Sequence, residues 1–194
     1  MKIFSSLYYK VIQWSKHPHA QYYLGGLSFA ESSFFPIPPD VMLAPMSVAQ
    51  PNRAFWFATL TTVTSVLGGI FGYLIGVFAF EFIEPWLQNS SYWHKFESAH
   101  TWFDEWGVWV IFVAGFSPIP YKLFTITAGV LSLALMPFIF ASFIGRGARF
   151  FLVAALLKYL GPKLEPIILK YVEWIGWVTV LLLIVTIAYF KFLQ

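Results

Sequence analysis

Long runs of hydrophobic residues alternate with short polar segments along this chain of 194 residues. Residues 54–80 contain no charged side chain. Residues 136–157 are interrupted only by two arginines, and residues 172–190 carry one glutamate at their edge. Because a helix needs about 20 apolar residues to cross a bilayer, we expect three membrane-spanning helices over these ranges.

Two further apolar stretches, residues 25–50 and 108–130, are interrupted by prolines. Proline withholds a backbone donor and disfavours a helical residue before it. Irregular backbone at membrane depth is tolerated only inside protein or beside a water-filled cavity. We therefore expect two re-entrant hairpins, each entering and leaving on one side of the membrane. Their tips are expected at Pro36 and Pro38, and at Pro118 and Pro120.

The two hairpins share a motif, Phe-x-Pro-Ile-Pro, which recurs at an offset of 82 residues and ends in Asp40 in one copy and Lys122 in the other. Chance recurrence is the alternative, but each copy is followed by a predicted spanning helix. A hairpin plus one helix crosses the membrane an odd number of times, so two such units must be inverted relative to each other, as in many transporters.

The expected fold is therefore an all-α integral membrane protein with a single membrane domain. It has two inverted repeats, at about residues 20–80 and 107–157, each a re-entrant hairpin plus a transmembrane helix. Apolar residues at steps of three and four predict an interfacial amphipathic helix between them, at about residues 86–106. An extra C-terminal transmembrane helix follows at about residues 172–190.

Composition and charge support this fold. Hydrophobic residues make up 59% of the chain and charged residues 11%, whereas soluble domains carry roughly 25% charged residues. This balance excludes a soluble enzyme, a disordered chain and a nucleic-acid binder. Lysines gather before the first span and at residues 158–170, while residues 81–106 are mainly acidic. By the positive-inside rule, the N-terminus of this multi-pass protein is expected in the cytoplasm.

Five ionisable residues fall within the predicted membrane layer: Glu31, Asp40, Lys122, Arg146 and Arg149. Charges at this depth are costly and usually serve a pathway, a relay or a partner. The two arginines are three positions apart and share one helix face. Their planar forks of donors suit a phosphate group. We therefore expect Arg146 and Arg149 to bind a substrate phosphate.

The other three residues each have two interpretations. Lys122 is either a third cation of the phosphate site or a side chain that extends to the membrane interface. Glu31 and Asp40 either couple the site to protons or pair with the arginines only to lock the repeats together. Asp40 is also a candidate helix cap after the preceding prolines.

Catalytic and metal-binding patterns are missing from the sequence. The chain has no cysteine, its four histidines lie outside the predicted spans, and no HExxH, GxSxG or P-loop motif occurs. We therefore expect no enzyme activity, no catalytic residue, no metal and no cofactor.

Several segments together resemble the DedA family, also called the SNARE-associated or VTT-domain family, and most of all its small YqaA-like branch. These segments are ESSFFPIPPD at 31–40, GGIFGYLIG at 68–76, GFSPIPYK at 115–122, and the two arginines. The resemblance implies a bacterial inner-membrane protein of lipid traffic, with functional roles for Glu31, Asp40 and Arg149. The chain departs from better-known branches, which carry arginines where it has Gly115 and Tyr121.

Residues and resemblance together predict a flippase that moves a phosphate-bearing lipid, either a phospholipid or undecaprenyl phosphate, between leaflets. Its expected partners are membrane lipids and protons, not nucleic acid, and the pattern leaves room for a homo-oligomer. Two alternatives remain open at this point. One is a proton- or cation-coupled exchanger of small solutes, and the other is a membrane scaffold whose ion pairs are structural.

Overall fold

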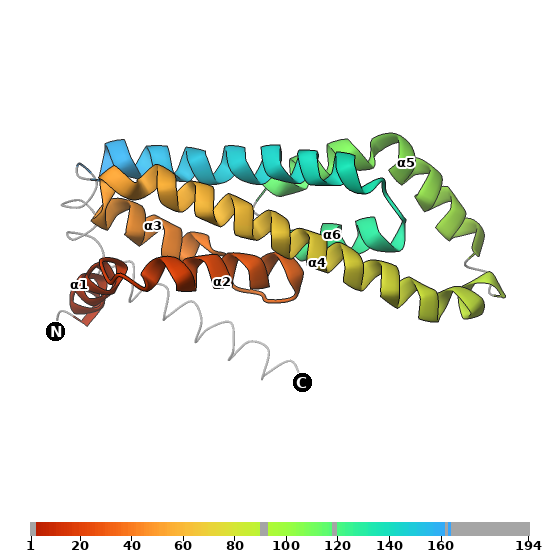
Figure 1. The fold of residues 1–194 in the computed structure, drawn as a ribbon, viewed down its shortest axis with the longest axis horizontal. Coiled ribbons are helices and arrows are strands. Elements are labelled where there is room, and N and C mark those ends of the chain that lie inside the picture. Colours follow the sequence, from red (N-terminus) through yellow and green to blue (C-terminus); the bar gives the residue numbers. More distant parts are fainter. Residues whose placement is uncertain (1–2, 90–92, 118–119, 162, 164–194) are drawn as a thin grey trace, which may run out of the picture.

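The computed structural model describes residues 3–89, 93–117, 120–161 and 163, and this part of the chain is helical, without a strand. Six α-helices and a short 3₁₀ helix are followed by one further long helix (Figure 1). In chain order they are α1 (Ile3–Ser15), α2 (Ala20–Ser33), α3 (Asp40–Ala49), η1 (Pro51–Arg53), α4 (Ala54–Gln88), α5 (Trp93–Phe116), α6 (Tyr121–Val130) and the Leu135–Gly161 helix.

Two of these helices are long and apolar enough to cross a membrane. They are α4, together with the turn before it, and the Leu135–Gly161 helix. Both coincide with spans expected from the sequence at residues 54–80 and 136–157, and α4 continues past residue 80 as far as Gln88. The third expected span, at residues 172–190, lies outside the described residues.

The two proline-interrupted stretches form pairs of helices. Helices α2 and α3 are joined by residues 34–39, and α5 and α6 by residues 117–120. Figure 1 shows the α2–α3 pair beside α1 at one end of the molecule, while α5 begins toward the other end. We name the connecting segments tip 1 (34–39) and tip 2 (117–120); the structure describes residues 117 and 120 of tip 2.

Pro45 does not interrupt the chain as the sequence suggested, because it lies inside α3. It withholds one N–H from the carbonyl four residues earlier, which costs a hydrogen bond without ending the helix. The helix breaks occur instead where prolines are dense. Helix α2 ends at Ser33 before Pro36, and α3 begins directly after Pro39.

The helix expected at about residues 86–106 has other bounds in the structure, which describes this range except for residues 90–92. Its position at the membrane interface stays a prediction. The first part of the range is the end of α4, and residues 93–106 are the first half of α5, which continues to Phe116. The physical reason is that residues 93–116 contain no proline and only two glycines, Gly107 and Gly115, so nothing stops the helix before Phe116.

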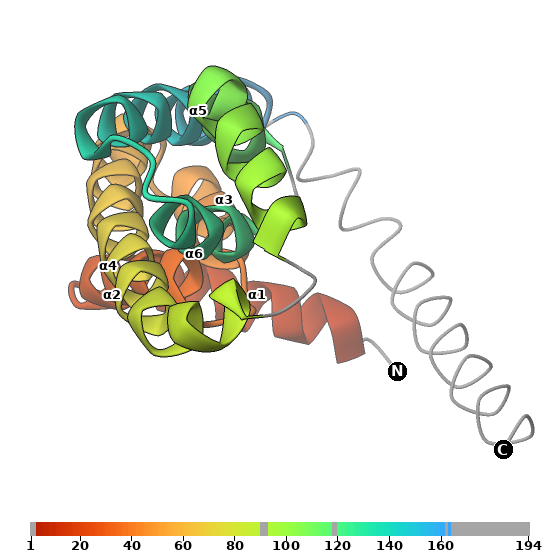
Figure 2. The same cartoon turned by 90° about the vertical axis from the view of Figure 1, so that its right-hand side faces the viewer.

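Two apolar clusters enclose a polar layer between them. One cluster joins α2, α3, α4 and the Leu135–Gly161 helix around Leu24, Leu43 and Phe57. The other joins α5, α6 and the Leu135–Gly161 helix around Tyr121 and Phe138. Seen along the long axis, α3 and α6 lie near the centre of the bundle (Figure 2). The buried polar side chains lie where these short helices meet α2 and α4.

Glycines allow α4 to approach its neighbours very closely. A Cβ atom on Gly68 would overlap the backbone carbonyl of Phe29 on α2, and one on Gly76 would overlap that of Ile126 on α6. Small residues at such crossings are typical of packed membrane helices. The close packing brings the backbone ends of α2 and α6 together at the polar layer.

Candidate functional site

The deepest charged residues of the polar layer form an ion pair between α2 and the Leu135–Gly161 helix. Nη2 of Arg146 lies 2.5 Å from Oε2 of Glu31, and the two side chains are 1% and 8% exposed. At this depth the attraction between opposite charges is strong, and either charge would be costly without its partner. We call this contact the inner pair.

Arg146 makes further hydrogen bonds and two cation–π contacts. Its Nε donates to Oγ of Ser65 at 2.6 Å, and Nη2 donates to Oγ of Ser32 at 3.3 Å. Its guanidinium carbon lies 4.9 Å from the ring centre of Tyr121 and 4.7 Å from that of Phe150. Hydrogen bonds and cation–π contacts together therefore hold the guanidinium in one orientation.

A second ion pair lies one helical turn away and is more accessible. Nη2 of Arg149 donates to Oδ2 of Asp40 at 2.6 Å, and Nη1 donates to the backbone carbonyl of Ser117, also at 2.6 Å. The side chains of Arg149 and Asp40 are 17% and 24% exposed. This outer pair connects tip 1 to tip 2, because Asp40 follows the first and Ser117 begins the second.

Asp40 does not act as a helix cap. The cap position of α3 is Pro39, and Asp40 makes no side-chain cap hydrogen bond. Its carboxylate instead lies at the first residue of α3, where the helix dipole favours a negative charge. The ion-pair interpretation of Asp40 replaces the capping one.

Lys122 lies at the start of α6 and contacts tip 1. Its Nζ donates to the backbone carbonyl of Phe34 at 3.2 Å. It does not line the cavity described next, so the structure does not bring it together with the two arginines. Lys122 therefore forms a contact between α6 and tip 1.

A small cavity of about 80 Å³ lies between the two tips and is lined by both ion pairs. The other lining residues include Phe35, Pro36, Pro38, Pro39 and Pro120. Pro118 lies outside the described residues. Sites for whole drug-sized ligands measure roughly 300–1,000 Å³, so this cavity has room only for a small polar group. Among the described residues, no three His, Asp or Glu side chains are placed to hold a metal ion.

Sequence analysis identified the charged residues of this site but not the side chains that hold them in place. Contacts to Arg146 were not expected from Ser32, Ser65, Tyr121 or Phe150. The sequence does contain a pattern that indicates the positions of the two serines. Ser28 and Ser32 on α2, and Thr61 and Ser65 on α4, repeat at four-residue steps that place them on one helix face.

Comparisons with known proteins show which proteins this chain is similar to. The VTT domain family matches residues 37–159, which contain four of the five charged residues. The chain is 50% identical over 190 residues to an uncharacterized protein of Haemophilus influenzae, with 98% of each chain covered. It is 48% identical to an uncharacterized protein of Histophilus somni, over 98% of this chain and 100% of the relative.

A more distant similarity connects the chain to a protein named for transport. It is 28% identical over 118 residues to undecaprenyl phosphate transporter A of Staphylococcus aureus, covering 56% of this chain and 58% of that protein. No solved structure gives a significant match. The family match spans more than half of the chain and agrees with its apolar helices, so the chain belongs to the VTT-domain, or DedA, family of membrane proteins.

Proposed function

We propose that this chain is a transporter that moves a phosphate-bearing lipid between the leaflets of the membrane. The observation that carries the proposal is the partly exposed fork of Arg149, which lies in a small cavity between the two tips. A guanidinium fork matches the oxygens of a phosphate as well as it matches a carboxylate. A phosphate can therefore take the position that Asp40 occupies.

In the proposed mechanism, Asp40 and the lipid phosphate compete for Arg149. Binding of the phosphate frees the carboxylate of Asp40, and the freed carboxylate takes up a proton. Release of the phosphate restores the pair and returns the proton. Glu31 and the phosphate compete for Arg146 in the same way. Because the inner pair is buried, its two residues exchange partners more slowly than those of the outer pair. Proton movement would in this way be coupled to lipid movement.

The architecture proposed for this cycle is a pair of inverted repeats with re-entrant hairpins. Their tips meet at the ion pairs and rock about them, so that the cavity opens to one side and then to the other. Lys122 helps to position tip 1 through Phe34. We propose that the protein lies in the bacterial inner membrane with its N-terminus in the cytoplasm, and that the arrangement is compatible with a homo-oligomer.

Similarity supports a lipid phosphate as the substrate. The related Staphylococcus aureus protein is named a transporter of undecaprenyl phosphate, and a phospholipid headgroup presents the same phosphate chemistry to Arg149. We therefore propose the phosphate of a phospholipid or of a polyprenyl phosphate as the recognised group.

The test compares Arg149→Gln with Arg53→Gln in vesicles of phosphatidylethanolamine and phosphatidylglycerol that contain fluorescent phosphatidylglycerol. Arg53 is exposed on the surface and lies outside the cavity. We expect transport to fall about tenfold or more in Arg149→Gln, since a hydrogen bond to a charged group contributes ~1.5–3 kcal/mol. Transport by Arg53→Gln should equal that of the wild type.

Folding is monitored by the melting temperature of each purified variant. Lipid transport by a folded Arg149→Gln protein at the wild-type rate would contradict the proposal. Proton movement driven by a pH gradient, without lipid movement in the wild type, would also contradict it and would favour an exchanger of small solutes.

A further inference from the structure

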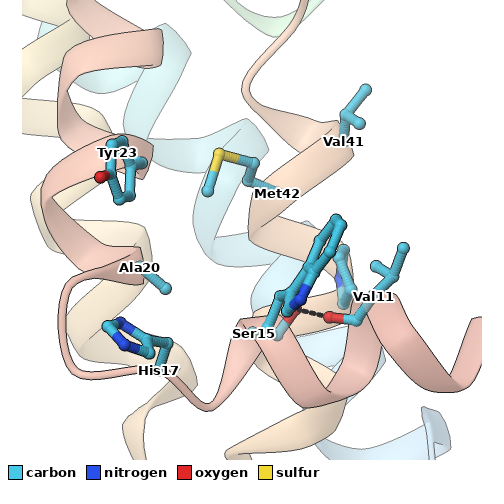
Figure 3. A pocket seen from close by; sticks show the side chains of 9 residues that line it. Val11, Ser15, His17, Ala20, Tyr23, Val41 and Met42 are labelled. Atoms are coloured by element: carbon cyan, nitrogen blue, oxygen red, sulfur yellow. Dashed lines mark hydrogen bonds between the residues drawn. The ribbon is translucent and has the colours of Figure 1, made fainter.

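An apolar groove lies between α1, α2 and α3, with a volume of about 450 Å³. Figure 3 shows Ala20 and Tyr23 of α2 on one side of it and Met42 and Val41 of α3 on the other. Trp14 of α1 also lines the groove and is 69% exposed. We name it groove 1.

Groove 1 reaches the ion-pair site along α3. Its lining includes Val41, and the preceding residue, Asp40, lines the small cavity and binds Arg149. The wall of the groove and the wall of the site are thus adjacent residues of one helix. Apolar hydrocarbon in the groove would lie next to a polar group in the cavity.

A second apolar groove, groove 2, lies on the α5–α6 side and has a volume of about 300 Å³. Trp102, Trp106 and Trp109 line it at steps of four and three along α5, followed by Val113 and Ser117. The backbone carbonyl of Ser117 accepts the hydrogen bond from Nη1 of Arg149. Groove 2 therefore includes a residue that contacts Arg149, and groove 1 includes a neighbour of Asp40, the other partner of that arginine.

The two grooves share three properties. Each is lined almost entirely by apolar side chains, and each has exposed tryptophan. Each also has a lining residue that is a partner of Arg149, as Ser117 is, or is adjacent in the chain to one, as Val41 is to Asp40. Tryptophan is enriched where membrane proteins meet the headgroup region. Helices α1 and α5 lie toward opposite ends of the molecule in Figure 1.

From this arrangement we infer that groove 1 and groove 2 hold the hydrocarbon chain of the transported lipid, one on each side of the ion-pair site. The inference rests on the proposed function. The cavity of about 80 Å³ accommodates the phosphate but not the rest of the molecule. The hydrocarbon must therefore lie outside the cavity, and the grooves offer apolar walls of about 450 Å³ and 300 Å³ beside it.

The grooves also answer a physical requirement of lipid transport. A lipid whose phosphate moves to the middle of the membrane must keep its chain in apolar surroundings throughout. If the chain lies in one groove before the step and in the other after it, the phosphate stays near Arg149 while the direction of the molecule reverses. One headgroup site then serves both leaflets.

The experiment fills each groove with a larger side chain. Val41 and Val113 are both 61% exposed, so Val41→Trp and Val113→Trp should fold. The matched control is Val63→Trp on α4, where Val63 is 43% exposed and lines neither groove. Transport of fluorescent phosphatidylglycerol is measured in vesicles of phosphatidylethanolamine and phosphatidylglycerol.

The expected result is a severalfold fall in transport for both groove variants and none for Val63→Trp, with unchanged melting temperatures. If the wild type moves lipid but either groove variant moves it as fast as Val63→Trp does, the inference fails and the proposed function stands. If the wild type moves no phosphate lipid, the proposed function fails and the inference fails with it.

A second measurement uses only the wild-type protein, so its result does not depend on whether a variant folds. Phosphatidylglycerol with a diazirine at the end of its acyl chain is cross-linked to the wild-type protein by light, and the labelled positions are found by mass spectrometry. We expect more label at Val41–Pro45 and at Val110–Val113 than around Val63. Equal labelling at all three places would show ordinary surrounding lipid and would overturn the inference.

Discussion

Burial separates two ion pairs that consist of the same kinds of side chain. The inner pair, Arg146 with Glu31, is almost wholly enclosed, and its arginine is also held by Ser32, Ser65 and two aromatic rings. The outer pair is partly exposed, and its arginine has one carboxylate and one carbonyl as partners. The inner arginine is therefore suited to hold the helices in place, and the outer one to exchange partners.

This difference predicts unequal effects of removing each carboxylate. Glu31→Gln leaves the buried guanidinium of Arg146 without a counter-charge, and breaking a buried pair in this way costs roughly 3–5 kcal/mol. Asp40→Asn should cost less, because Arg149 still has access to water. Thermal unfolding in detergent should therefore give a lower melting temperature for Glu31→Gln than for Asp40→Asn. Equal melting temperatures would show that burial does not distinguish the pairs.

At the scale of elements, sequence reasoning succeeded where local chemistry decides the structure. Residues 54–80 contain no charged residue and no proline, so a long helix was the natural prediction. The proline-dense segment at 36–39 also ends α2 and starts α3 where expected. The helix expected at about residues 86–106 has other bounds, because no residue marks its expected ends. Nothing between Trp93 and Phe116 stops a helix, and α5 continues through the range.

The candidate site could be predicted only in part, for a similar reason. Each of the five charged residues can be identified from the sequence, because each stands inside an apolar stretch. The pairing of Arg146 with Glu31, 115 positions apart, depends on how two helices are rotated about their axes. Close contacts such as the one at Gly68 set that rotation. Neither Arg146 nor Glu31, taken alone in the sequence, indicates these contacts.

Gly68 therefore offers a test of the packing of α2 on α4. Gly68→Ala places a Cβ against the carbonyl of Phe29, so the helices must separate, at a cost of about 1–3 kcal/mol for overpacking. The matched control is Gly26→Ala, since a Cβ at Gly26 meets nothing within 4 Å. Melting temperatures should fall for Gly68→Ala and stay unchanged or rise for Gly26→Ala. A Gly68→Ala protein as stable as the control would contradict the close approach.

At the scale of the whole molecule, polar contacts at and beside the tips connect the two helix pairs, in addition to the packing of α2 against α6. Arg149 joins Asp40 to Ser117, and Lys122 reaches the carbonyl of Phe34. Contacts of this kind exchange more readily than the apolar clusters on either side. The tips are therefore the part of the bundle where a change in accessibility can occur while the long helices keep their packing.

If tip 1 must separate from α6 during transport, fixing the two to each other should stop transport. Because the chain has no cysteine, Phe34→Cys with Lys122→Cys creates a single pair that a reducible bis-maleimide linker joins across tip 1 and α6. The control pair is Phe55→Cys with Phe151→Cys, whose native rings lie 6.0 Å apart between α4 and the Leu135–Gly161 helix. Lipid transport in vesicles should cease in the linked tip variant, return on reduction, and continue in the linked control. Transport that persists with the tips linked would mean that lipid passes without their separation, and the rocking of the tips would have to be abandoned.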